Sequence, residues 1–324
     1  MRKNHTKWAA VAAALALLLA ACGDNGDNGD TGTEEGSGGG AGDVLVDGSS
    51  TVAPLAEVAA ELFMDANPDI RVTVATSGTS AGFESFCQGE ADMNNASREI
   101  KESEIELCGE NEIGYDGVQV ANDALALLVN NDNPVDCLTV DQANQIWDEG
   151  STVSSWGEVD GLDLPADFED EPLTLYGPGT DSGTFDFFTE AINGEEGKIR
   201  TDYTNIGEDD NAAVTAVIGD VAAMGYVPYS YFQEAGDTVK PLAIDGGDGC
   251  IDATLENVED GSYTPLGRPL FTYASDTALE KAEVLSFIDF WIENSSEISE
   301  TAGFVPMTQD QIDESNAKVE ELTS

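Results

Sequence analysis

Serine, threonine and glycine residues gather in three segments of the chain, at 47–54, 76–83 and 177–185. In each segment, hydroxyl residues lie where a helix is expected to begin. The first N–H groups of a helix have no partner within the helix, and the positive end of the helix dipole lies beside them. Hydroxyl groups next to free N–H groups form a site for a small oxyanion. The three segments therefore predict an anion-binding site, although serine and threonine are also common as ordinary helix caps.

The elements around these segments are expected to bring them together. Each segment follows a short apolar run typical of a strand, and each is followed by apolar residues at helical spacing. In open α/β sheets a ligand binds beyond the carboxyl ends of the strands, where such strand-to-helix junctions gather. We therefore expect three helix N-termini to meet at one anion.

Arginine is scarce in this chain, so Arg98 stands out. After residues 1–22 the sequence has four arginines, Arg71, Arg98, Arg200 and Arg268. Arg98 lies in a polar segment rather than on an expected helix face. Because a guanidinium group can hold two oxygens of an oxyanion at once, Arg98 is a candidate for the positive charge of the site. The alternative is an ordinary surface arginine among acidic residues.

Four motifs follow one another in the order and spacing of a known family. They are Gly-Ser-Ser-Thr-Val-Ala-Pro at 48–54, Ser-Gly-Thr-Ser-Ala-Gly-Phe at 77–83, Asn-Ala-Ser-Arg at 95–98 and Thr-Asp-Ser-Gly-Thr-Phe at 180–185. These motifs resemble the phosphate-binding proteins of PstS-type ABC importers, and the resemblance extends over nearly the whole mature chain. It implies an α/β, two-lobed periplasmic-binding-protein fold of a type II-like class, with phosphate held between two lobes on a hinge.

The resemblance also implies a function and a ligand set. The protein would be a solute receptor that binds inorganic phosphate and delivers it to the permease subunits of an ABC importer, with no catalysis and no cofactor. Closure of the lobes would remove water and strengthen each hydrogen bond to the anion. The expected ligand residues are Ser50, Thr51, Val52, Thr79, Ser80, Ser97, Arg98, Asp181, Ser182, Gly183 and Thr184.

The chain departs from the best-known members of this family at two places. They carry an aspartate, which accepts the proton of hydrogen phosphate and so excludes sulfate, where Ser97 and Arg98 stand here. They also carry an arginine just before the last motif, near Pro178 of this chain. Asp181 is a candidate either to pair with Arg98 or to take over as the proton acceptor. A receptor for another tetrahedral oxyanion, such as sulfate, is therefore one alternative, and an exported phosphatase is another.

Residues 1–22 are predicted to be a lipoprotein signal peptide. Three basic residues precede an apolar run of about 14 residues, shorter than the helix of about 20 that spans a membrane. The run ends in Leu-Ala-Ala-Cys, which resembles a lipobox, so Cys22 would carry the lipid; a conventional signal peptide is the alternative. Residues 23–42 are polar, acidic and Gly-rich and are expected to form a disordered tether. We therefore expect a monomer anchored by lipid on the extracytoplasmic face of the cell membrane, periplasmic or extracellular.

The chain is strongly acidic, with 64 acidic and 12 basic residues and a net charge of −52. Removal of residues 1–22 takes away three basic and no acidic residues, which leaves a net charge of about −55. Such a surface argues against nucleic-acid binding. In molar salt the screening length is about 3 Å, so surface carboxylates would hardly affect an anion held by direct contacts. We therefore expect a salt-loving host, with an ordinary acidic secreted protein as the alternative.

Four cysteines follow Cys22, an even number that suggests two disulfides in an exported protein. Three pairings are possible. We favour Cys87–Cys108, which would close a local loop, and Cys137–Cys250, which would join the start and the end of the second lobe.

The mature chain has no histidine, because His5 lies in the expected signal peptide. A Ser-His-Asp triad needs an imidazole to take the proton of the serine, so the Thr-Asp-Ser-Gly turn is not expected to be a hydrolase site. No Cys-x-x-Cys pair is present either, and we expect no metal site. A carboxylate-bridged metal phosphatase is the enzyme that this composition leaves open.

The lobes are expected to be formed by 43–126 together with 245–324, and by 127–244. Residues 124–129 are apolar without alternation, which is typical of a strand buried on both faces, and we expect this strand to cross from the first lobe to the second. The return crossing is expected at 239–244.

Overall fold

Strands and helices alternate along most of the chain in the computed structural model, which describes residues 42–180, 182–207 and 209–323. The strands of this part are β1 (Gly42–Gly48), β2 (Ile70–Val74), β3 (Met93–Ala96), β4 (Tyr115–Val129), β5 (Cys137–Thr139), β6 (Thr174–Gly177), β7 (Thr204–Asn205), β8 (Ala223–Pro228), β9 (Lys240–Pro241), β10 (Ala243–Asp245), β11 (Cys250–Ile251) and β12 (Gly267–Ser275). The helices are α1 (Ala53–Ala66), α2 (Thr79–Cys87), α3 (Glu102–Glu110), α4 (Val140–Trp147), α5 (Gly183–Asn193), α6 (Asp210–Gly219), α7 (Tyr229–Ala235), α8 (Leu255–Glu259), α9 (Asp276–Leu279), α10 (Ala282–Glu293), α11 (Ser295–Ala302) and α12 (Gln309–Leu322). None of these helices is long and apolar enough to cross a membrane.

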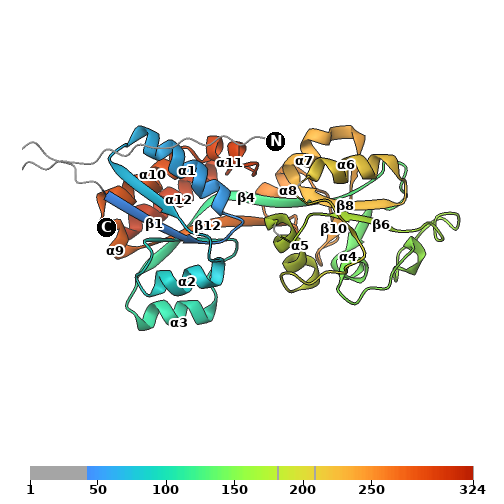
Figure 1. The fold of residues 1–324 in the computed structure, drawn as a ribbon, viewed down its shortest axis with the longest axis horizontal. Coiled ribbons are helices and arrows are strands. Elements are labelled where there is room, and N and C mark those ends of the chain that lie inside the picture. The colour runs from blue at the N-terminus through green and yellow to red at the C-terminus, as the bar shows by residue number, and fades with distance from the viewer. Residues whose placement is uncertain (1–41, 181, 208, 324) are drawn as a thin grey trace, which may run out of the picture. The chain divides into compact units, whose positions relative to one another are not determined.

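A mixed sheet of nine strands runs through the described residues in the order β2-β1-β3-β12-β4-β8-β6-β7, with β9 added beside β4. The pairs β1–β2, β1–β3, β6–β7 and β6–β8 are parallel, whereas β12 is antiparallel to both β3 and β4, and β4 is antiparallel to β8. Figure 1 shows β4 and β12 as the two long strands that the helices of both halves flank. The sheet and its covering helices agree with the α/β class expected from the sequence.

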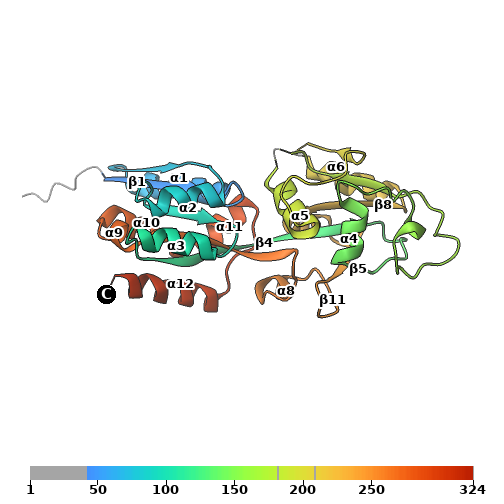
Figure 2. The same ribbon diagram turned by 90° about the horizontal axis from the view of Figure 1, so that it is seen from below.

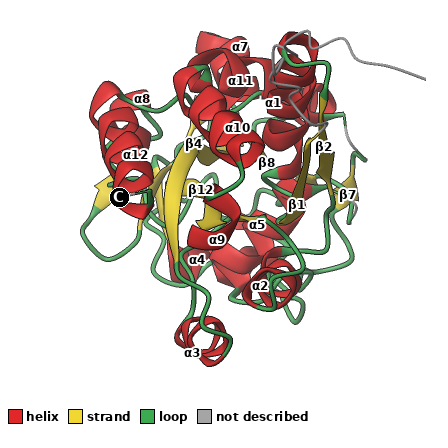
Figure 3. Ribbon diagram, turned by 90° about the vertical axis from the view of Figure 1, so that its left-hand side faces the viewer, coloured by secondary structure: helices red, strands yellow, loops and turns green. Residues whose placement is uncertain are grey.

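The first hydrophobic core forms around β1, β3, β12 and the start of β4. Alternate residues of β1 are buried, among them Val44 and Val46, because one face of the strand lies on helices. Phe63 of α1 meets Phe287 of α10 edge to face, with ring centroids 5.2 Å apart. Burial of such a side chain contributes about 1.5–3 kcal/mol. Figure 3 shows α1 and α10 on one side of these strands and α2 and α3 on the other.

Helices α2 and α3 cover the opposite face and pack side by side (Figure 2). Phe83 and Phe86 of α2 are fully buried there, and the ring of Phe83 lies 4.9 Å from that of Tyr273 on β12. A disulfide joins Cys87 of α2 to Cys108 of α3, as the sequence predicted. The disulfide and the aromatic contacts hold α2, and with it the second Ser/Thr segment, against β1 and β3.

The second hydrophobic core forms around the end of β4, β6 and β8. Phe188 of α5 stacks on Tyr226 of β8 with ring centroids 3.8 Å apart, and Trp147 of α4 meets both rings edge to face. These contacts fix α5, which carries the third Ser/Thr segment at its start.

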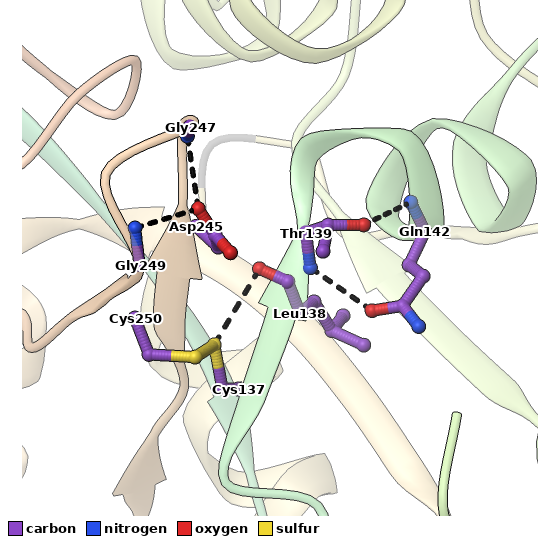
Figure 4. The surroundings of a disulfide bond; sticks show 8 residues. All are labelled: Cys137, Leu138, Thr139, Gln142, Asp245, Gly247, Gly249 and Cys250. Carbon is purple, nitrogen blue, oxygen red and sulfur yellow. Dashed lines mark hydrogen bonds between the residues drawn. A yellow bond between two sulfur atoms is a disulfide. The ribbon is translucent and has the colours of Figure 1, made fainter. Parts of the chain in front are cut away.

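A smaller sheet of three strands, in the order β11-β10-β5, lies beside the second core. Strand β10 pairs parallel to β5 and antiparallel to β11. The second disulfide joins Cys137 of β5 to Cys250 of β11, and Asp245 accepts hydrogen bonds from the backbone N–H groups of Gly247 and Gly249 in the turn between β10 and β11 (Figure 4). The expected pairing of all four cysteines is therefore confirmed.

Strand β4 takes part in both cores. Val118 and Val120 near its start belong to the first core, whereas Leu125 and Leu127 near its end belong to the second. The residues after β11, such as Val258 and Leu266, still pack in the second core, and Leu270 of β12 is back in the first.

These contacts favour a return crossing at β12 rather than at 239–244. The lobe limits drawn from the sequence stay a prediction, and we would move the second limit from residue 245 to Gly267. Residues 1–41, which include Cys22 and nearly all of the expected tether, lie outside the described part.

Candidate anion-binding site

The first two Ser/Thr segments lie against each other, and glycine makes this approach possible. Helix α1 begins just after residues 49–51 and helix α2 begins at Thr79, as the sequence predicted. A Cβ atom on Gly82 would lie 2.1 Å from Oδ1 of Asn94 and 2.5 Å from Cα of Gly48. Gly48 itself has a φ of 125°, which favours glycine, and a Cβ there would lie 2.2 Å from the carbonyl oxygen of Asn95. Larger residues at these two positions would push the loops apart.

A cavity of 390 Å³ lies between these two segments and the start of α5. Its lining is rich in hydroxyl groups and contains both signs of charge. The lining residues are Ser49, Ser50, Thr51, Ser77, Gly78, Thr79, Ser80, Ala81, Ser97, Arg98, Lys101, Asp186, Phe187, Glu190, Glu196 and Arg268. The exposed hydroxyls and the first-turn N–H groups of α1 and α2 are the donors that a small oxyanion needs.

The third segment reaches the same place from the other side. Ser182, Gly183 and Thr184 line a neighbouring cavity of 530 Å³ together with Ser50 and Thr51. A Cβ on Gly183 would lie 3.6 Å from Cα of Thr51, so the starts of α1 and α5 are close neighbours. Thr51 therefore belongs to both cavities and marks where the three helix starts meet.

Two hydroxyl groups connect the second segment to the end of β3. The Oγ1 atom of Thr79 lies 3.2 Å from Oγ of Ser97, and the backbone N–H of Ser97 donates to Thr79 Oγ1 over 3.4 Å. These contacts hold Ser97 at the rim of the cavity. Val52, by contrast, buries its side chain completely in the first core, so it offers the site only its backbone N–H.

Arg98 lies in the cavity wall, but its guanidinium is already held by protein groups. It donates two hydrogen bonds of 2.7 and 2.9 Å to the carboxylate of Glu104, one to the carbonyl of Glu99 and one to Oγ of Ser80. Burial alone would raise the pKa of Glu104, but hydrogen bonds from Arg98 and from the Lys101 backbone lower it, so the carboxylate stays charged. Arg98 thus fixes Ser80 in place.

A second guanidinium, that of Arg268 on β12, also lines the cavity. It donates to Oγ1 of Thr51 and to Oδ2 of Asp123, each over 3.3 Å, and lies 3.6 Å from Oε2 of Glu190. The guanidinium carbon stands 3.5 Å from the centre of the Phe187 ring. Burial lowers the pKa of Arg268 and raises that of Asp123. The opposite charge of the partner acts against each shift, since Asp123 favours the charged form of Arg268 and Arg268 favours the charged form of Asp123.

Asp186, in the first turn of α5, adds a carboxylate to the same wall. Burial and the nearby charges of Glu196 and Glu190 raise its pKa to about 6, although Arg268 acts in the opposite direction. An anion in the cavity would meet a carboxylate that is charged above this pH and neutral below it.

Comparison with known proteins identifies the family. Residues 33–295 match the model of a PBP superfamily domain. The chain is 42% identical over 267 residues to protein SphX of Synechococcus elongatus, covering 82% of this chain and 77% of the relative. It is 33% identical over 309 residues to the phosphate-binding protein PstS of Staphylococcus saprophyticus, covering 94% of this chain and 91% of the relative.

The chain belongs to the PstS-type phosphate-binding proteins. A solved structure described as a possible phosphate binding protein from Planctomyces limnophilus superposes on this PstS-type chain with a TM-score of 0.82 at 38% identity, covering 88% of this chain and all of that one. The fold is therefore the two-lobed periplasmic-binding-protein fold, and the protein is a binding protein rather than an enzyme.

The structure of this PstS-type protein places most of the expected ligand residues around one site. Ser50, Thr51, Thr79, Ser80, Ser97 and Arg98 line the first cavity, and Ser182, Gly183 and Thr184 line the second. Asp181 lies outside the described residues. Among the described residues no group of three or more His, Cys, Asp or Glu side chains is placed to hold a metal ion.

The sequence did not identify Arg268 and Asp186 as residues of the site. Neither lies in one of the four motifs, and each reaches the cavity through the packing of its strand or helix. One signal was available for Arg268, since it is one of four arginines in an acidic mature chain. No comparable signal marks Asp186 among 64 acidic residues.

Proposed function

We propose that this protein is the phosphate-binding solute receptor of an ABC importer, which holds inorganic phosphate between its two lobes and releases it to the permease. The observation that carries this proposal is the meeting of three helix starts at Thr51, where hydroxyl and N–H donors line adjoining cavities. An oxyanion fits such donors because it accepts several hydrogen bonds at once. No group transfer is needed for this function.

The proposed ligand set is the one implied by the family motifs. In that set, hydroxyl and backbone donors would come from residues 50–52, 79–80, 97 and 182–184, Arg98 would supply positive charge, and Asp181 is the candidate proton acceptor. The proposed location is the extracytoplasmic face of the cell membrane, with a lipid on Cys22, a monomeric receptor domain and an acidic surface adapted to high salt. The basis for these last points is the leader-like sequence at 1–22 and the net charge of −52.

A second candidate is a receptor for another tetrahedral oxyanion such as sulfate. It is favoured by the pair Ser97 and Arg98, which stands where the best-known relatives carry their proton-accepting aspartate. Sulfate lacks the proton that such an acceptor recognises, so a site without the acceptor would admit both anions.

Calorimetric titration separates the two candidates. The chain without residues 1–22 is titrated with phosphate and with sulfate in 2 M NaCl at pH 8. A phosphate receptor gives a micromolar or tighter Kd for phosphate and at least about 100-fold weaker binding of sulfate. Similar affinities for both would support the second candidate, and the absence of binding to either would contradict both. Release of phosphate from a generic ester, with and without a chelator, then tests for a phosphatase.

A further inference from the structure

Arg98 has little capacity left for a ligand. A guanidinium carries five N–H groups. Four of those on Arg98 are engaged, two by the carboxylate of Glu104, one by the carbonyl of Glu99 and one by the hydroxyl of Ser80. The bidentate pair with Glu104 also compensates its charge at close range, over 2.7 and 2.9 Å. A phosphate ion would have to break this pair in order to be held bidentately by Arg98.

Arg268, in contrast to Arg98, has most of its N–H groups available for a ligand. It donates one hydrogen bond to Asp123 and one to Thr51, so three of its five N–H groups have no hydrogen-bond acceptor among the described residues. Its two carboxylate neighbours stand at 3.3 and 3.6 Å, longer than a close charge-assisted hydrogen bond. The side chain of Arg268 is only 13% exposed, so water can accept few hydrogen bonds from these free N–H groups. A buried guanidinium with free donors is suited to an anion.

The position of Arg268 connects the two cores. Arg268 lies on β12 opposite Asp123 of β4, at the place where both long strands pass from one core to the other. Its guanidinium contacts Thr51 at the start of α1, which belongs to the first core, and Phe187 and Glu190 of α5, which belongs to the second. One side chain therefore touches both halves of the site and the strands between them.

We propose that Arg268 is the guanidinium that contacts the bound anion, and that the anion replaces Glu190 as its partner. This inference rests on the proposed function and names the charged group of that site. The planar fork of Arg268 presents its free N–H groups beside Thr51, where they hold two phosphate oxygens while Asp123 keeps the other side of the group in place. Arg98 acts as a positioning residue, which orients Ser80 through its pair with Glu104.

Two charge-neutral double variants compare the arginines. Arg268→Gln with Asp123→Asn removes one buried pair, and Arg98→Gln with Glu104→Gln removes the other, so neither leaves an uncompensated buried charge. Phosphate is titrated calorimetrically into each variant in 2 M NaCl, and thermal unfolding reports whether the variants fold. Loss of hydrogen bonds from a charged donor to the anion is expected to weaken binding about 30- to 150-fold in the first variant. The second variant is expected to lose less than about fivefold, because a positioning residue acts indirectly.

A third variant tests the exchange of partners. Glu190→Gln removes the carboxylate that competes with the anion, so phosphate is expected to bind about three- to tenfold more tightly. The matched control is Glu195→Gln, which removes a charge that pairs with Lys198 on the surface, and it is expected to leave the affinity unchanged. The gain from Glu190→Gln is expected to vanish when Arg268→Gln and Asp123→Asn are also present, since the two effects share one guanidinium. A purely structural role of Arg268 would not produce this dependence.

The outcomes are distinct. The proposal is wrong if the variant without Arg268 and Asp123 binds phosphate within threefold of the unmodified chain, or if the variant without Arg98 and Glu104 loses more affinity. If the first variant fails to fold, Arg268→Lys decides, because lysine keeps the charge but not the planar fork; a loss of about tenfold supports the proposal and unchanged affinity overturns it. If the unmodified chain does not bind phosphate, the proposed function itself fails, which is a different result.

Discussion

At the scale of single residues, the two arginines of the site have carboxylate neighbours that offset their positive charge. Arg98 and Arg268 face the cavity, but Glu104, Asp123 and Glu190 lie beside them. The carboxylates therefore cancel much of the electric field that the two guanidinium groups produce in the cavity. Affinity for the anion then has to come from hydrogen-bond donors in direct contact with it. Such a site discriminates by geometry and protonation, since a misplaced oxygen leaves a buried donor without a partner.

Asp186 gives this site a pH dependence that can be measured. Its folded-state pKa of about 6 lies above the ordinary 3.8, so folding is favoured by its protonated form, and this contribution is lost as pH rises through 6. Asp186→Asn is therefore expected to raise the unfolding midpoint more at pH 8 than at pH 5. The charge that repels an anion disappears too, so the variant is expected to bind phosphate about three- to tenfold more tightly at pH 8 and equally at pH 5.

The affinities of the variant and of the unmodified chain are compared at the same pH, so the ionisation state of phosphate is the same in both measurements. Asp237→Asn, at an exposed aspartate far along the chain from α5, is the control and is expected to change neither quantity. Equal effects of Asp186→Asn at both pH values would contradict the assignment. The charged groups that face Asp186 are Glu190, Glu196 and Arg268.

At the scale of elements, the sequence predicted the helix starts and missed the long-range partners. The starts of α1, α2 and α5 could be predicted because strand, glycine and hydroxyl signals all lie within about ten residues. The contacts of Arg268 could not, because its partners Asp123 and Thr51 lie 145 and 217 residues away in sequence. The packing favours a return crossing at β12 rather than at 239–244, and no local signal marks β12 because its pairing with β4 is set by the whole sheet.

The contact between the first two loops yields a prediction at this scale. Gly82→Ala would place a Cβ 2.1 Å from Asn94 and 2.5 Å from the backbone of Gly48, so the loops would have to separate. We expect a loss of about 1–3 kcal/mol in the free energy of unfolding and weaker phosphate binding. Gly109→Ala in α3 is the matched control, because nothing lies within 4 Å of its added Cβ. It is expected to be neutral or to stabilise by about 0.5–1 kcal/mol. A tolerated Gly82→Ala with unchanged affinity would show that the loops do not need this approach.

At the scale of the whole molecule, the acidic composition sets the conditions under which the fold is stable. The chain has 64 acidic residues against 12 basic ones, so most carboxylates have no cation to pair with. Their mutual repulsion disfavours the folded state, which holds them closer together than the unfolded chain does. The cores and the two disulfides oppose this repulsion from within, and salt can weaken it from outside.

Salt is therefore expected to stabilise this protein. Raising NaCl from 0.1 M to 1 M shortens the screening length from about 10 Å to about 3 Å. We expect the midpoint of thermal unfolding to rise by at least about 10 °C over this range, because screening removes repulsion from the folded state. Sucrose at equal osmolarity is the control, since it acts by exclusion from the surface and leaves the charges unscreened, so a smaller rise is expected. A midpoint that is flat or falls in NaCl would mean that the carboxylates are too far apart to repel one another. The acidic composition would then say nothing about the salinity in which the protein works.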